Sequence, residues 1–178
     1  VDEKRFQASP IVICGASGTG KTVLLSQLLQ AYPARTETSF GALTPFDYGV
    51  LYAPLNQELS LSLVLRSLAQ QAGLVFLAHE SDANLLYRLR QLLESNPIVM
   101  LLDGARDAET ARRLMVVNLE ISPVMITTNY PDVAQELAKS NEFIVEMKGF
   151  TAEDAALYYR RVYQQKATVH KQKHMDEL

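Results

Sequence analysis

Residues Gly15-Ala16-Ser17-Gly18-Thr19-Gly20-Lys21-Thr22 decide the fold, because of what stands on either side of them. They follow the run Ile11-Val12-Ile13-Cys14, which is typical of a strand buried on both faces. They precede a helical pattern that starts at about Lys21 and ends before Pro33. The eight residues fit G-x-x-x-x-G-K-[ST], a phosphate-binding pattern that is specific when a strand precedes it and a helix comes after it.

The chemistry of this loop explains its residue types. Glycines let the backbone approach an anion and aim several N–H groups at it, and the start of the helix adds a favourable dipole. Lys21 would contact the β- and γ-phosphates, and the Thr22 hydroxyl would bind Mg²⁺. We therefore expect ATP or ADP with Mg²⁺ to contact Gly15, Ala16, Ser17, Gly18, Thr19, Gly20, Lys21, Thr22 and Val23.

Outward from this loop, apolar runs alternate with helical patterns. The alternation predicts an α/β fold with three layers, α/β/α, around a five-stranded, mostly parallel sheet. The expected strands after the loop are residues 50–53, 98–102, 124–128 and 143–147, and residues 34–48 form a loop. The expected helices are residues 58–72, 81 or 82 to 93, 108–118, 133–138 and 151–166. We expect one domain over residues 1–166 and a polar, disordered tail over residues 167–178.

Asp103 is the second candidate for a metal site. It ends the most apolar run, residues 98–102, and a carboxylate at a strand tip can hold Mg²⁺ through water. The alternative is a turn, since Asp103-Gly104 is a common turn dipeptide. Many hydrolytic P-loop enzymes place a second carboxylate after this aspartate, and Gly104 therefore predicts weak ATP hydrolysis.

Asn129 closes the strand that contains Thr127 and Thr128. A hydroxyl or amide at this strand end could sense the γ-phosphate, whereas Asn129-Tyr130-Pro131 is also suited to a turn or a helix cap. Ligands in open α/β sheets lie beyond the carboxyl ends of the strands. We expect Lys21, Asp103 and Asn129 to take part in catalysis, and Thr22 and Asp103 to bind the metal.

Composition and net charge bear on the partners and the location that we expect for the chain. The net charge of −3 over 178 residues leaves no overall basic character for nucleic acid, and no apolar stretch reaches the length of a membrane span. Cys14 is the one cysteine, so the chain has no internal disulfide and a reducing, cytoplasmic location is expected. The start at Val1 suggests a piece of a larger protein.

In the order of its motifs the chain resembles the nucleotide-binding domain of the STAND class, the NB-ARC type of apoptosome ATPases and plant disease-resistance proteins. The matching segments are residues 15–22, 49–55, 97–103, 124–129, 143–147 and 150–159. The resemblance implies a sheet in which the P-loop strand and the Asp103 strand flank the strand before Asn129. It also implies a cytoplasmic regulator of signalling or defence that rests with ADP, assembles with ATP, and works with other domains or copies of itself.

Two departures keep other readings open. Gly104 replaces the usual second acid, and Asn129 stands where that family commonly has arginine. The family's helical lid and winged helix are absent beyond Lys166, which implies looser nucleotide binding. Thr128 to Asp132 also resembles the sensor segment of AAA+ motors, although no arginine between Asn129 and Arg160 could act as a finger. A small-molecule kinase and a scaffold without nucleotide are the remaining alternatives.

Overall fold

The computed structural model of the chain describes residues 9–31, 49–55, 59–94, 96, 98–161 and 163. The chain divides into two compact units, Val1–Met147 and Lys148–Leu178. The loop predicted at residues 34–48 and the boundary predicted at residue 166 lie outside the described residues. In the second unit, residues 152–161 form a helix that Thr151 caps by accepting a hydrogen bond from the Asp154 N–H (3.1 Å).

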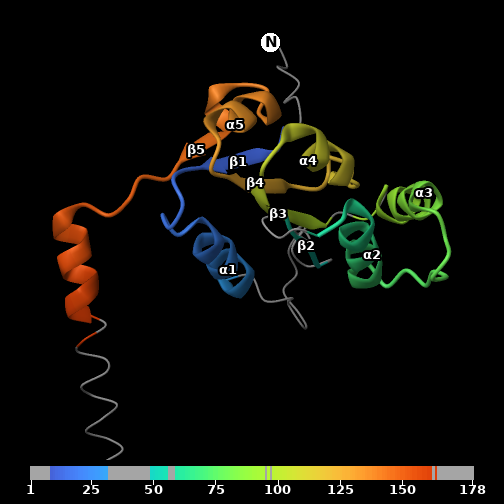
Figure 1. The fold of residues 1–178 in the computed structure, drawn as a ribbon, viewed down its shortest axis with the longest axis horizontal. Helices are drawn as coiled ribbons and strands as arrows, with labels where there is room; N and C mark the ends of the chain where they lie inside the picture. Colours follow the sequence, from blue (N-terminus) through green and yellow to red (C-terminus); the bar gives the residue numbers. More distant parts are fainter. Residues whose placement is uncertain are drawn as a thin grey trace, which may run out of the picture. The chain divides into compact units, whose positions relative to one another are not determined.

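Five strands of the first unit form one sheet, in the order β2-β3-β4-β1-β5 (Figure 1). Their bounds are Ile11–Cys14 for β1, Val50–Pro54 for β2, Val99–Ala105 for β3, Val124–Thr128 for β4 and Ile144–Glu146 for β5. Every neighbouring pair is parallel. The α/β fold and the five-stranded sheet are confirmed, and β4 lies between the P-loop strand and the Asp103 strand, as the sequence resemblance implied.

Helices cover both faces of this sheet. Figure 1 shows helix α1 on one side of it and helices α4 and α5 on the other. The helices are α1 Lys21–Ala31, α2 Leu61–Gln71, α3 Asp82–Leu93, α4 Ala108–Leu114 and α5 Pro131–Leu137, with a 3-10 turn at Asn141–Phe143. The three-layer arrangement places the loop after β1 at the carboxyl edge of the sheet.

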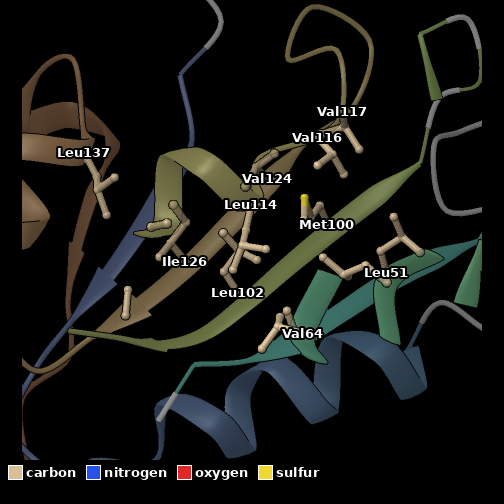
Figure 2. Packing of buried hydrophobic residues seen from close by; sticks show 14 of the residues in the cluster. Leu51, Val64, Met100, Leu102, Leu114, Val116, Val117, Val124, Ile126 and Leu137 are labelled. Atoms are coloured by element: carbon tan, nitrogen blue, oxygen red, sulfur yellow. The ribbon is translucent and has the colours of Figure 1, made fainter. Parts of the chain in front are cut away.

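The core has two parts because alternate residues of each strand face opposite sides. The larger cluster joins β2, β3 and β4 to α2, α3, α4 and α5. The residues of this cluster that Figure 2 labels are Leu51, Val64, Met100, Leu102, Leu114, Val116, Val117, Val124, Ile126 and Leu137. The smaller cluster contains Ile13, Leu25, Val99 and Leu101. Cys14 is buried with the larger cluster, and burial raises the pKa of its thiol. Cys14 is therefore a small core residue, as the sequence suggested.

Several helix and strand boundaries differ from the sequence prediction. Helix α2 starts at Leu61 rather than at residue 58, because the Ser60 hydroxyl accepts from Leu63 N and caps it. Helix α4 ends at Leu114 rather than at residue 118, because the chain turns at Met115. The apolar residues 116 and 117 that suggested more helix are buried in the core instead.

The sequence predicted that Asp103 ends strand β3. The strand instead continues to Ala105, with an irregular register after Leu102. Helix α5 begins at Pro131, two residues before the predicted start, since proline suits the first turn of a helix. The choice between Ser81 and Asp82 as the cap of α3 is settled, because the Ser81 hydroxyl accepts from Asn84 N.

Strand β2 lies at one edge of the sheet and is held from outside by a glutamine. The side-chain oxygen of Gln71, on α2, accepts from Tyr52 N (2.8 Å). The side-chain nitrogen of Gln71 donates to Tyr52 O (2.9 Å). One amide thus satisfies both backbone groups of Tyr52, and helix α2 is tied to the edge strand at this residue.

Candidate functional site

The loop between β1 and α1 has the backbone that its glycines allow. Gly18 and Gly20 have φ values of 81° and 94°, a region that residues with a side chain rarely adopt. The Thr19 hydroxyl donates to Ala16 O (2.9 Å) and closes the turn. Helix α1 then begins at Lys21, so its N-terminal dipole points at the space above the loop.

Gly15 is required for a different reason, which is close packing. A Cβ atom at Gly15 would clash with the backbone oxygen of Met147. Met147 comes directly after β5, and its N–H donates to Cys14 O (2.7 Å). The end of β5 therefore lies directly against the base of the loop, and this contact leaves no room for a side chain.

Lys21 is buried, with 7% of its surface exposed, and its ammonium group faces the loop. Nζ donates to Gly15 O and to Ala16 O, both at 2.8 Å. Because an ammonium group has three N–H donors, one remains for an anion. The two carbonyl contacts position the positive charge at the centre of the loop.

Asp103 is buried, with 2% of its surface exposed, and it accepts hydrogen bonds from three hydroxyl groups. Thr22 Oγ1 lies 2.9 Å from Oδ2 and 3.1 Å from Oδ1. Thr127 Oγ1 donates to Oδ1 (2.5 Å), and the Tyr52 hydroxyl donates to Oδ2 (3.2 Å). The two predicted metal ligands, Thr22 and Asp103, are therefore in direct contact.

Tyr52 is the residue of this site that the sequence prediction missed. Burial, followed by the negative charge of Asp103, raises the pKa of its phenol, so the hydroxyl remains a donor at neutral pH. In the sequence, Tyr52 stands out only as a tyrosine inside an apolar strand. In the structure, Pro54, two residues further along β2, pairs in register with Asp103. Alternation along the strand puts the Tyr52 and Asp103 side chains on the same face of the sheet.

Gly104 occupies the position where a catalytic acid is common, and its backbone is unusual. Its φ is 85°, which disfavours any residue with a side chain. Its N–H donates to Thr127 Oγ1 (2.7 Å), the hydroxyl that also bonds Asp103. The irregular register of β3 thus brings Gly104 and Thr127 together below the carboxylate.

The three residues at the end of β4 have separate roles. Thr127 bonds Asp103, whereas the Thr128 hydroxyl donates to Ala105 O (2.7 Å) and accepts from Tyr130 N (3.1 Å). The N-cap of α5 is Tyr130, so Asn129 is not the cap that the sequence left open. Asn129 instead lines the cavity above the loop.

This cavity, of about 310 Å³, brings most of the predicted site residues together. Its lining residues are Ser17, Gly18, Gly20, Lys21, Thr22, Val23, Asp103, Gly104, Thr127 and Asn129. Val23, which was expected to contact the nucleotide, is 63% exposed and belongs to this lining. Gly15, Ala16 and Thr19 are not lining residues; they shape the loop behind Lys21.

The donor set suits a magnesium ion that is bound together with phosphate. Mg²⁺ prefers oxygen ligands and is usually held by one or two carboxylates, water and substrate phosphates. The Thr22 hydroxyl and the Asp103 carboxylate supply such oxygens within 3.1 Å of each other. Among the described residues, no group of three or more His, Cys, Asp or Glu side chains could hold a metal by itself. The protein part of the site thus fits Mg²⁺ only in company with a phosphate ligand.

Two larger cavities lie away from the loop and lack such chemistry. One, of about 390 Å³, lies between residues 75–81 and helix α3, but its carboxylate, Glu80, is already bonded by Arg88 and Asn84. The other, of about 420 Å³, lies between α3 and residues 115–118. Of these three cavities, only the smaller one is lined by the P-loop.

Over the part of the chain that the structure describes, no helix combines the length and the hydropathy needed to cross a membrane.

Comparison with solved structures identifies the same fold. Cdc6p from Pyrobaculum aerophilum superposes with a TM-score of 0.56 at 17% sequence identity, over 82% of this chain and 40% of that one. A structure described as Drosophila ORC bound to GC-rich DNA and Cdc6 gives a TM-score of 0.44 at 11% identity, over 82% and 53% of the two chains. The chain therefore spans about half the length of these proteins or less.

The expectation that the chain has no nucleic-acid partner stays a prediction. A search of curated proteins finds no significant match. A family described as "AAA domain" matches residues 4–119, which include the P-loop, Asp103 and Gly104. The sheet order, the Lys21 loop and this match lead to one conclusion: the chain belongs to the AAA domain family of P-loop NTPases.

Proposed function

We propose that the chain is the nucleotide-binding domain of an AAA-type ATPase and that the cavity above the P-loop binds ATP or ADP with Mg²⁺. The observation that carries this proposal is the convergence of Lys21, Thr22 and Asp103 on one cavity at the carboxyl ends of β1 and β3. Adenine as the base rests on family membership, because no described residue singles out a base.

Each residue has a role that its geometry supports. The free N–H of Lys21 would donate to the β- and γ-phosphates, while the carbonyls of Gly15 and Ala16 hold its ammonium group. Thr22 and Asp103 would hold Mg²⁺, which reduces the negative charge of the phosphates when it is bound. Asn129 would donate to the γ-phosphate, a contact that ADP does not offer.

Hydrolysis by a single chain should be slow. Asp103 is the one carboxylate among the described lining residues, and it is already committed to Thr22, Thr127 and Tyr52. Gly104 offers no acid to activate water. A second copy of the chain, or another domain, would then have to complete the site.

A nucleotide-controlled switch of the STAND type is the second candidate, and the left-handed Gly104 favours it. A site without a second acid keeps its ATP, so the contact between the γ-phosphate and Asn129 could persist and shift a conformational equilibrium. The partner domains and a cytoplasmic location belong to this proposal.

A kinase is less well supported. Lys21 is the one cation among the described lining residues, and binding a second phosphorylated substrate needs more positive charges than this.

Steady-state ATP turnover over a range of protein concentrations tests these readings. The samples are the wild-type chain with Mg²⁺ and the Lys21→Ala variant. Turnover that rises steeply with concentration and disappears in Lys21→Ala supports an assembled ATPase. Slow turnover that is independent of concentration supports the switch. The absence of nucleotide binding in the wild type would contradict both.

A further inference from the structure

We infer that Tyr52 is a positioning residue for the metal-binding carboxylate, Asp103. The role deepens the proposed function and rests on it, because it concerns the same Mg²⁺–nucleotide site. The argument starts from the three hydroxyl groups around Asp103, which come from three different elements. Thr22 lies on α1, Thr127 on β4 and Tyr52 on β2.

The three contacts differ in what metal binding would do to them. Thr22 is itself one of the two proposed metal ligands, so its hydroxyl would turn from the carboxylate to the ion. Thr127 bonds Oδ1 and Tyr52 bonds Oδ2, and neither needs to leave when the metal binds. A carboxylate held at both oxygens cannot rotate without breaking one of these two bonds. Tyr52 and Thr127 therefore fix the plane of Asp103.

The position of Tyr52 is itself well determined. Its ring packs against the smaller core cluster of Ile13, Leu25, Val99 and Leu101. Its backbone N–H and C=O are both bonded by the Gln71 side chain at 2.8 and 2.9 Å. The backbone of Asp103 is tied to the residue that follows the same strand, since Leu55 N donates to Asp103 O (2.7 Å). The hydroxyl of Tyr52 thus reaches Asp103 from a rigid support.

Groups that orient a metal ligand commonly change metal affinity by roughly 10- to 100-fold when removed. Nucleotide affinity without metal should respond much less, because Tyr52 is not among the residues that line the cavity. The specific consequence of losing the Tyr52 hydroxyl is therefore a smaller gain in nucleotide affinity when Mg²⁺ is added.

The experiment measures the affinity of a fluorescent ADP analogue for the full 178-residue chain, once in Mg²⁺ and once in EDTA. We expect Tyr52→Phe, which keeps the ring, to reduce the ratio of the two affinities by roughly 10-fold. Tyr87→Phe is the matched control, because Tyr87 lies on α3, is 62% exposed and is not among the residues that line the cavity. Mn²⁺ binding in the presence of ADP, followed by electron paramagnetic resonance, gives a direct second readout.

Thr127 provides the internal comparison on the other oxygen of Asp103. Thr127→Ser keeps a hydroxyl and should retain the wild-type ratio, whereas Thr127→Val should lower it as Tyr52→Phe does. An unchanged ratio in Tyr52→Phe, with a wild type that responds to Mg²⁺, overturns the positioning role alone. A wild type that does not bind the analogue overturns the proposed function instead.

Discussion

At the scale of the single residue, the carbonyl of Met147 explains why position 15 holds a glycine: it leaves no room for a side chain. We expect Gly15→Ala to lose about 1–3 kcal/mol of unfolding free energy, because its Cβ would clash with that oxygen and the strand end would have to move. Urea denaturation measures the loss. Gly149→Ala is the control, since no atom lies within 4 Å of the Cβ that it adds. Equal stability of the two variants would contradict the close contact.

At Gly104 the requirement for glycine comes from the backbone conformation rather than from a neighbouring atom. A non-glycine residue at its φ of 85° costs about 1–2 kcal/mol, and asparagine tolerates this region better than most. We therefore expect Gly104→Glu to be less stable than wild type and Gly104→Asn to lie between them. Thermal unfolding of the three proteins checks the order. Glutamate as well tolerated as asparagine would mean that the left-handed conformation is not required here.

At the scale of the element, the connection between α2 and α3 depends on Glu80. Its carboxylate accepts from Asn84 (2.7 Å) and from Arg88 (2.8 and 2.9 Å), and the hydrogen bonds from Arg88 lower its pKa below the usual 4.5. A lowered pKa stabilises the fold above the unfolded-state value, and this contribution is lost as the pH falls through the folded-state value. The charged form of Glu80 is thus the one that supports the connection.

We therefore expect Glu80→Gln to lower Tm at pH 7, and we expect its difference from wild type to shrink below about pH 4.5. Differential scanning calorimetry across this pH range provides the measurement. Glu109→Gln serves as the reference, because Glu109 and its partner Arg113 are both largely exposed and 3.9 Å apart. A Tm difference for Glu80→Gln that stays constant down to about pH 2 would disprove the assignment.

Helix α2 offers a second comparison within one element. Leu68 is fully buried against the sheet, whereas Leu63, on the same helix, is 55% exposed. We expect Leu68→Ala to cost about 2–5 kcal/mol and Leu63→Ala to cost under about 0.5 kcal/mol. Guanidinium denaturation followed by circular dichroism distinguishes them. Similar losses would mean that α2 packs on the sheet through another face.

At the scale of the whole molecule, the site should act on the stability of the fold. A ligand that binds only the folded chain adds about 2.7 kcal/mol at about 100 times its Kd. We expect MgADP to raise Tm in the wild type and to leave Tm nearly unchanged in Lys21→Ala. The comparison uses the ligand-induced shift, because Lys21→Ala also removes two hydrogen bonds to the loop. An equal shift in both proteins would place the nucleotide elsewhere.

The fold was predictable because local patterns agree with the global arrangement. The run before Gly15 and the apolar residues 98–102 are too short and too apolar for anything but buried strands, and the P-loop motif requires a helix directly after the first of them. The predicted end of a helix was wrong where apolar residues beyond it keep the helical spacing. Val116 and Val117 have this spacing, but they are buried in the core after the chain has turned at Met115.

The site residues that belong to a sequence motif were predictable. A residue that reaches the site only through the pairing of distant strands was not. Lys21, Thr22 and Asp103 each stand in a recognisable local context, and all three line one cavity. Tyr52 has no such context, since its partner is 51 residues away. Its contact depends on the pairing of β2 with β3, which the sequence does not specify residue by residue.

The amide of Gln71 has a consequence for how the molecule behaves among other copies of itself. An open sheet edge exposes backbone donors and acceptors on which another chain can add a strand and start aggregation. At Tyr52 both of these groups are already used by Gln71, so a side chain takes the place that a foreign strand would occupy. The same amide that steadies the tyrosine thereby limits the growth of the sheet beyond β2.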